Sequence, residues 1–313
     1  MTRPLHVFAD PALGRYGFPS GHPLGVDRQG AFLSAFAGQG LDRRAPLQAS
    51  RPASREELLR FHTLAFVDQV LNAERDGREM LDDGDTPVFP GVYEAGAAVV
   101  GAALEGLSQV MRGECRATMQ PIGGLHHARR DRAAGFCVFS DLGVVVETLR
   151  SEYGIRKVAY VDIDVHHGDG VYYPFEDDPD LVFADIHQDW RSLYPGTGRP
   201  EETGRGNARG TKLNINLPAG AGDAAFLAAW PDVVRHLRRF HPQFVLFQCG
   251  ADAMDGDPLG HLRYSVQAYA HAARSLRHLA DDSCAGRIMA FGGGGYDRRN
   301  LAAAWCAVVR ELS

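Results

Sequence analysis

One short stretch, residues 161–170, constrains this chain more than any other. It reads Val-Asp-Ile-Asp-Val-His-His-Gly-Asp-Gly and follows the apolar run 157–161, which is typical of a buried strand. Side chains alternate along a strand, so we expect Asp162, Asp164 and His166 to point to the same face. Buried carboxylates are costly unless they are paired or bind a metal. The stretch therefore predicts a divalent cation site, and the alternative is a solvated polar exit from a strand.

Size and composition exclude several function classes. The 313 residues suit one α/β domain spanning residues 1–313, since no linker, repeat or low-complexity tract divides them. A net charge of −6 gives no general attraction to nucleic acid or an anionic membrane. No apolar run is long enough for a spanning helix, and residues 1–10 lack the apolar core of a signal peptide. We therefore expect a cytoplasmic protein.

The cysteines do not predict disulfides or a thiolate metal site. They number five, an odd count, and no two form a C-x-x-C pair. This usage is typical of a reducing compartment. A zinc site in this chain would therefore use histidine and carboxylate ligands.

Apolar runs that end in polar clusters, each followed by a helical segment, recur along the chain. The runs are 115–121, 157–161, 181–184, 244–248 and 287–291. Alternating strands and helices predict an open parallel sheet flanked by helices on both faces. In such sheets ligands bind beyond the carboxyl ends of the strands. We therefore expect the polar clusters to meet at one edge of the sheet.

Other segments predict the elements around this sheet. Residues 6–9 are expected to form a first strand, and residues 28–38 a helix. Ser54 and Glu57 form the pattern of a capping box, which predicts a helix from there to Phe66. The segment 91–111 is rich in small apolar residues and predicts a tightly packed buried helix.

Two neighbouring histidines are candidates for proton transfer. His126 and His127 follow Gly123-Gly124, and each imidazole N–H could be accepted by a carboxylate, Asp162 or Asp169. Such a carboxylate would set the tautomer and basicity of its partner. Without these acids the pair would be ordinary polar loop residues.

Asp252 is a candidate third metal ligand. It follows the apolar run 244–248 and would complete a set with Asp164 and His166. Three protein ligands leave a coordination position open, which is characteristic of catalytic zinc, and such a site polarises a carbonyl and acidifies bound water. Iron(II) is an alternative ion at a site of oxygen and nitrogen ligands. The competing interpretation is that Asp252 belongs to an ordinary turn.

Tyr296 follows four glycines and is a candidate oxyanion donor. The glycines let the backbone approach a ligand closely, and the phenol could donate a hydrogen bond to a developing negative charge. A nucleotide-phosphate loop is the alternative, but the spacing and context match the dinucleotide fingerprint poorly.

At this point the chain resembles the histone deacetylase-like zinc deacetylases, including the bacterial acetoin-utilisation type, which have the arginase–deacetylase fold. The resemblance covers essentially the whole chain, with six motifs in the family's order. The motifs are Gly123–Ala128, Gly135–Cys137, Asp162–Gly170, Tyr194–Gly198, Gly250–Asp252 with Gly256–Pro258, and Gly292–Tyr296.

The resemblance implies a role for each chemical group. Asp164, His166 and Asp252 would bind zinc. His127, oriented by Asp169, would act as general base and then acid. His126 would be its companion, paired with Asp162, and Tyr296 would stabilise the tetrahedral oxyanion.

The resemblance also implies a substrate channel and a second ion. The channel residues would be Asp85, Gly135, Phe136, Tyr194, Leu259 and Gly294; Asp85 would contact substrate backbone amides, or else be a plain turn residue. A potassium ion would lie near Asp162, Asp164, His166, Asp185 and Ile186.

Four positions depart from the family's pattern. Leu193 replaces an aromatic residue, Tyr194 replaces the more usual Phe, and Asp185 replaces Ser. Leu259 stands where polyamine-selective members tend to place Glu, which weakens a polyamine interpretation.

We therefore expect a metal-dependent hydrolase that removes acetyl or acyl groups from amides, with acetyl-lysine or a similar acetylated amine as substrate. The alternatives are an acetylpolyamine or other small-amide hydrolase, a binuclear manganese ureohydrolase, and a non-catalytic binder of acylated ligands. The oligomeric state is not indicated by the sequence.

Overall fold

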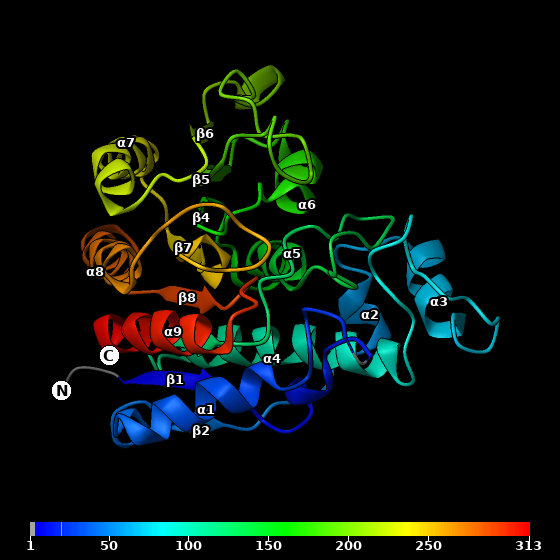
Figure 1. The fold of residues 1–313 in the computed structure, drawn as a ribbon. Helices are drawn as coiled ribbons and strands as arrows, with labels where there is room; N and C mark the ends of the chain where they lie inside the picture. Colours follow the sequence, from blue (N-terminus) through cyan, green and yellow to red (C-terminus); the bar gives the residue numbers. More distant parts are fainter. Residues whose placement is uncertain (1–3, 20) are drawn as a thin grey trace.

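All strands in the described part of the chain lie in one parallel sheet. The structure is a computed structural model that describes residues 4–19 and 21–313. The eight strands run in the order β2-β1-β3-β8-β7-β4-β5-β6 (Figure 1). Their bounds are β1 Leu5–Phe8, β2 Leu47–Gln48, β3 Ala117–Gln120, β4 Val158–Asp162, β5 Leu181–Gln188, β6 Lys212–Leu217, β7 Phe244–Gln248 and β8 Ile288–Phe291.

Helices cover both faces of this sheet, as predicted. Helices α1, α7, α8 and α9 contribute buried residues to one hydrophobic core, and α3, α4 and α5 contribute to the other (Figure 1). The bounds are α1 Arg28–Gly38, α2 Arg55–Leu58, α3 Leu64–Asn72, α4 Val92–Arg112, α5 Asp141–Tyr153, α6 Asp169–Tyr172, α7 Asp223–Phe240, α8 Val266–Ser283 and α9 Arg298–Leu312. No helix in the described ranges is long and apolar enough to cross a membrane.

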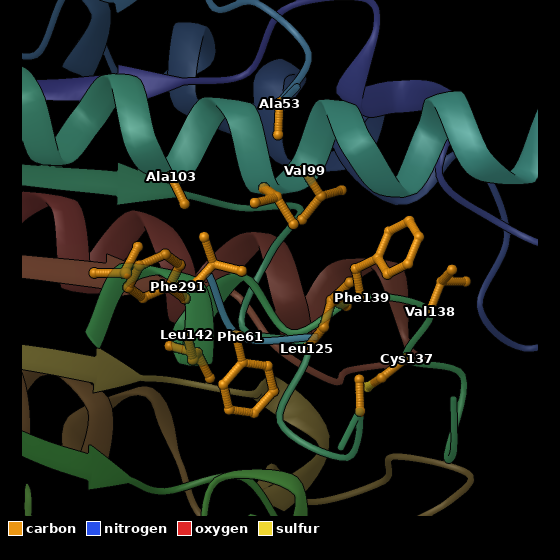
Figure 2. Packing of buried hydrophobic residues seen from close by; sticks show 14 of the residues in the cluster. Ala53, Phe61, Val99, Ala103, Leu125, Cys137, Val138, Phe139, Leu142 and Phe291 are labelled. Carbon is orange, nitrogen blue, oxygen red and sulfur yellow. The ribbon is translucent and has the colours of Figure 1, made fainter. Parts of the chain in front are cut away.

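Helix α4 is the long buried helix that its composition predicts. Small side chains let it pack closely: the N–H of Ala53 donates to the carbonyl of Ala97 at 2.8 Å. Figure 2 shows Val99 and Ala103 of α4 together with Phe139 and Phe291 in the buried cluster. This helix therefore supports the sheet close to the end of β8.

Four strands that are scattered in sequence are neighbours at the centre of the sheet. The order β3-β8-β7-β4 is continuous, and the ends are in register, with Gln120 beside Phe291, Phe291 beside Gln248 and Gln248 beside Asp162. The loops that follow these strands therefore start side by side. This arrangement is what brings the predicted polar clusters together.

Some element predictions were incomplete or wrong. The capping box at Ser54 is present, but its helix ends at Leu58, and α3 starts separately at Leu64 behind the N-cap Thr63. A bond from Thr63 N to Arg130 O, at 2.8 Å, is a tertiary contact that local sequence does not reveal. Strand β5 continues to Gln188, so Asp185 lies within it rather than after it.

A buried lysine holds the sheet edge at β6. The ammonium of Lys212 donates to Asp178 O at 2.8 Å, Leu181 O at 2.5 Å and Thr211 Oγ1 at 3.1 Å. Burial lowers the pKa of Lys212 to about 8. All three acceptors are neutral oxygens. By bonding to them, the ammonium joins the turn before β5 to the start of β6.

Replacing Lys212 with methionine should destabilise the fold. Three oxygens would lose their donor, while the cost of burying an ammonium would be relieved, so we expect the unfolding free energy to fall by about 1–3 kcal/mol. Urea denaturation measures this change. Lys157→Met, at a position that is only half-buried, is the matched control, and equal stability of the two variants would contradict the role of Lys212.

Candidate active site

Asp164, His166 and Asp252 converge into one buried group. One ligand atom from each lies within 4.8 Å of the others. His166 Nδ1 is 3.0 Å from Asp164 Oδ1 and 3.2 Å from Asp252 Oδ2. The three predicted metal ligands are thus brought together from the loop after β4 and the loop after β7.

The residues of this group fit a divalent cation. Asp252 Oδ2 is buried and, within the described chain, has no hydrogen-bond partner. Burial and the nearby Asp164 carboxylate raise the pKa of Asp252 to about 7. Two carboxylates held this close repel each other, and a cation between them would remove that repulsion.

Neighbouring groups fix the orientation of both carboxylates. Asp164 Oδ2 accepts hydrogen bonds from Gln248 Nε2 and from Gly294 N, each at 2.9 Å. Asp252 Oδ1 accepts from Val165 N at 3.0 Å. A Cβ at position 294 would lie 2.0 Å from Asp252 Oδ2, so only glycine permits this approach. Gln248 is a site residue that the sequence reasoning missed.

The prediction that Asp162, Asp164 and His166 share one strand face is wrong. Strand β4 ends at Asp162. Beyond it, Asp162 Oδ1 accepts the N–H of Asp164 at 3.0 Å, and Asp164 Oδ1 accepts the N–H of His166 at 3.1 Å. These side-chain bonds replace the hydrogen bonds between strands, and the chain leaves the strand conformation. Asp162 therefore lies outside the metal-ligand group.

The two histidines are paired with the two carboxylates expected from the sequence. His126 Nδ1 lies 2.8 Å from Asp162 Oδ2, and His127 Nδ1 lies 2.6 Å from Asp169 Oδ1. Asp169 also accepts from Arg129 Nη2 at 2.6 Å. An ionised Asp169 requires a proton on His127 Nδ1, which leaves Nε2 of the neutral ring free to accept one.

The electrostatic environments of the two rings differ. Burial and the neighbouring His126 lower the pKa of His127 to about 4, against the opposing effect of Asp169. For His126 burial acts in the same direction, but Asp162 and Asp164 outweigh it and raise its pKa to about 9. Near pH 7 the protein therefore holds a neutral His127 beside a more basic His126.

Backbone bonds to a buried acid position the histidine loop. Asp141, at the start of α5, accepts the N–H of Gly124 at 2.7 Å and that of Leu125 at 2.9 Å. Asp141 was not identified from the sequence. Its position just after a Ser N-cap made it look like an ordinary first-turn helix residue.

Tyr296 lies at the end of the glycine loop that follows β8. Buried Arg28 holds this loop by donating to Gly295 O at 2.9 Å and Gly293 O at 2.6 Å. Burial and the nearby Asp252 raise the pKa of the Tyr296 phenol well above its usual value, so the hydroxyl keeps its proton. Sequence reasoning missed Arg28, which reaches this loop from α1.

A cavity of about 250 Å³ contains these groups and opens to the surface. Every predicted channel residue lines it, as do three apolar residues that the sequence analysis did not select. The predicted residues are Asp85, Gly135, Phe136, Tyr194, Leu259 and Gly294, and the added ones are Leu24, Leu125 and Cys137. The lining is mainly apolar, with His127, His166 and Tyr296 supplying polar groups.

The mouth of the cavity combines aromatic and acidic groups. Tyr194 is 43% exposed, and its ring meets the His127 ring edge-on, with ring centres 5.1 Å apart. Asp85 Oδ1 accepts the N–H of Gly135 at 3.2 Å. Gly135 has φ +54°, and a Cβ there would lie 2.4 Å from the His127 ring. Asp85 also lines an adjoining surface cavity with Tyr194.

The residues expected around a second ion lie next to the metal group. Asp185 on β5 is in register with Asp162 on β4, and Ile186 follows it in the same buried strand. Asp185 Oδ2 accepts from Gly168 N at 2.9 Å, whereas buried Oδ1 has no hydrogen-bond partner in the described chain. Burial and Asp162 raise the pKa of Asp185 well above its usual value.

Comparison with known proteins decides the family. The model of the histone deacetylase domain matches residues 22–312. The chain belongs to the histone deacetylase family. Histone deacetylase-family members are deacetylases, so the predicted enzyme class is confirmed, as is the resemblance itself. The family acts on acetylated substrates and is in general zinc-dependent, with which the buried Asp-His-Asp group is compatible.

Relatives of several origins share this similarity. The acetoin utilization protein AcuC of Bacillus subtilis is 39% identical over 271 residues, covering 84% of this chain and 70% of the relative. Histone deacetylase RPD3 of Saccharomyces cerevisiae is 32% identical over 314 residues, covering 97% of this chain and 70% of the relative.

A solved structure supports the fold. The crystal structure of the HDA15 HD domain superposes with a TM-score of 0.90 at 27% identity, covering 99% of this chain and 88% of that one. The predicted arginase–deacetylase fold is therefore confirmed.

Zinc should stabilise the metal-free deacetylase at one site. A ligand that binds only the folded state raises the unfolding free energy by about 2.7 kcal/mol at 100 times its Kd. We expect one equivalent of zinc and a higher Tm in the native protein, and loss of both effects in Asp252→Asn. Calorimetric titration and thermal unfolding measure them.

Asp223→Asn is the control for this measurement. Asp223 lies at the start of α7, where its carboxylate accepts from Ser265 rather than facing the metal group. Undiminished zinc binding by Asp252→Asn would remove Asp252 from the ligand set.

Proposed function

We propose that this deacetylase hydrolyses N-acetylated amines, with an acetyl-lysine side chain as the substrate class, by zinc-dependent chemistry. One observation carries the proposal. One mainly apolar cavity is lined by Asp164 and His166 of the Asp164-His166-Asp252 group, by His127, which is paired with Asp169, and by Tyr296. These are the ligand set, the base and the oxyanion donor that amide hydrolysis needs.

Asp164, His166 and Asp252 would hold the metal. A divalent cation bound there would polarise the amide carbonyl and make an attacking water more acidic. Zinc is the proposed ion, and iron(II) is the alternative that suits the same oxygen and nitrogen ligands.

His127 is proposed as the proton carrier. Its Nδ1–H is held by Asp169, so Nε2 accepts a proton as water adds to the amide carbon. The same Nε2 then protonates the amine nitrogen as the C–N bond breaks, which yields a carboxylate and a free amine. His126, held by Asp162, would be the companion of this ring.

Tyr296 is proposed as the oxyanion donor. Its phenol stays protonated because burial and Asp252 oppose ionisation, and it can donate to the carbonyl oxygen as negative charge develops. Gly293 and Gly294 line the cavity, so backbone rather than side chain would face an acyl group bound there.

The lining of the cavity favours an uncharged alkyl chain. Phe136, Leu259 and Leu125 offer apolar walls that suit the methylene groups of lysine. Leu259 supplies no partner for the ammonium groups of a polyamine. An acetylpolyamine remains the second candidate because Asp85 and Asp82 line the adjoining cavity at the mouth.

A monovalent cation is proposed beside Asp185. The carboxylates of Asp185 and Asp162 lie on neighbouring strands, and one Asp185 oxygen is buried without a partner. A potassium ion would compensate that charge, with Asp164, His166 and Ile186 lying along the same two segments.

A ureohydrolase or a non-catalytic binder fits the site less well. Two bridged manganese ions would require more carboxylates than this group contains, and binding alone would not require the oriented His127–Asp169 pair. A cytoplasmic location is part of the proposal and rests on the sequence alone.

Tyr296→Phe should lower kcat for an acetyl-lysine peptide by about 100- to 1000-fold with KM nearly unchanged, because the lost bond forms mainly in the transition state. Acetate release measures this loss.

The native enzyme treated with chelator should be inactive and should recover when zinc is restored.

Tyr93→Phe is the matched control. Tyr93 lies on α4, where it packs against Phe139, and it does not line the cavity. An acetylated polyamine assayed in parallel tests the second candidate. Full activity of Tyr296→Phe would contradict the assigned oxyanion role, and binding without turnover on both substrates would contradict hydrolysis.

A further inference from the structure

Asp257 is a buried carboxylate that the proposed chemistry leaves unused. It lies five residues after the metal ligand Asp252 and is 6% exposed. Its Oδ1 accepts the N–H of Leu259 at 3.0 Å. Its Oδ2 accepts the N–H of Tyr296 at 2.7 Å and that of Asp297 at 3.2 Å. One carboxylate thus joins the loop after β7 to the loop after β8.

Two of the three residues held by Asp257 line the reaction cavity. Leu259 forms part of its apolar wall, and Tyr296 carries the phenol. Their relative placement therefore depends on a bridge between separate loops. Misplacement of a reacting group by a fraction of an ångström to an ångström is enough to slow catalysis strongly.

The glycine loop needs such external bonds because it has little conformational preference of its own. Arg28 holds the carbonyls of Gly293 and Gly295, and Asp164 holds the N–H of Gly294. Arg298 Nη1 donates to Tyr296 O at 2.9 Å. The hydrogen bond from Tyr296 N to Asp257 adds a further external contact to this loop, at Tyr296 itself.

The chemistry of the bridge requires a carboxylate. Oδ1 and Oδ2 accept from opposite loops, so both atoms must be acceptors. In asparagine one of them becomes an NH₂ group, which would face N–H donors. In the described part of the chain no Lys or Arg lies within ion-pair distance of Asp257, so backbone amides alone offset its burial.

We propose that Asp257 is a positioning residue that aims the phenol of Tyr296 at the reacting carbonyl. This inference rests on the proposed function of Tyr296 and adds the group through which that function is set. Asp257 touches neither substrate nor metal. It acts through the amide of Tyr296, and secondarily through Leu259.

A double-mutant cycle of Asp257→Asn and Tyr296→Phe tests the proposal. In the native background Asp257→Asn should lower kcat for the acetyl-lysine peptide by about 10- to 100-fold with KM changed less than about threefold. In the Tyr296→Phe background the same substitution should have almost no further effect, since coupled residues are not additive. Metal content should stay at one equivalent.

Structural damage and positioning give different results in this cycle. Equal losses in both backgrounds would overturn the inference while leaving the proposed function intact. Asp223→Asn is the control, because its carboxylate also bridges a loop to a helix through Ser265 N, at 2.7 Å, yet lies outside the cavity. Its kcat should be unchanged. If Asp257→Asn does not fold, Asp257→Ser, which keeps one acceptor, replaces it.

A second readout does not depend on turnover. In protein labelled with ¹³Cζ-tyrosine, Tyr296→Phe identifies the Tyr296 resonance by its loss. Asp257→Asn should shift that resonance and leave those of distant tyrosines such as Tyr93 and Tyr153 in place. An unshifted resonance overturns the inference. A native enzyme that shows no hydrolysis but shows this shift overturns the proposed function alone.

Discussion

The burial of four carboxyl groups within β4 and β5 and in the loops after β4 and β7 is the constraint on which this structure depends. Asp162, Asp164, Asp185 and Asp252 are all fully buried there. Each must lose its charge or gain a partner, because isolated buried carboxylates are strongly unfavourable. Asp162 gains the ring of His126, whereas Asp252 and Asp185 each keep an oxygen with no hydrogen-bond partner among the described residues. The apolar sheet thus creates a demand for cations at the place where the loops meet.

The loops around this charge are organised by side chains rather than by regular structure. Asp141 accepts hydrogen bonds from the two backbone amides just before His126. Arg28 donates to two backbone carbonyls in the glycine loop just before Tyr296. Asp257 does the same for the two loops that carry Leu259 and Tyr296. A buried charge bonded to several backbone groups fixes a loop more firmly than one neutral bond does, because charge-assisted bonds are stronger. The reactive groups are therefore held by buried charged side chains that do not themselves line the cavity.

Sequence reasoning reached the parts of this molecule that local pattern encodes. The apolar runs before Asp162 and after Pro242 are buried strands, and the capping box at Ser54 is present. It missed what depends on distant contacts. Strand β6 was not predicted although Lys212–Leu217 alternates polar and apolar residues, and its buried positions include the polar Lys212 and Asn214. Arg28 and Gln248 act on loops far from them in sequence, so no local signal marks them. The alternation past Asp162 failed because carboxylates replaced the ladder bonds.

The contrast between His126 and His127 shows how neighbouring residues of one type acquire different chemistry. Each ring is buried and each bonds a carboxylate through Nδ1. The difference lies in the second charge that each ring meets: His126 Nε2 faces Asp164 Oδ1 at 3.8 Å, whereas Asp169 is shared with Arg129. Burial and repulsion from the neighbouring His126 together outweigh the stabilisation that Asp169 would give to a charged His127. His127 is therefore the weaker base and stays neutral, which is the state that a proton acceptor requires.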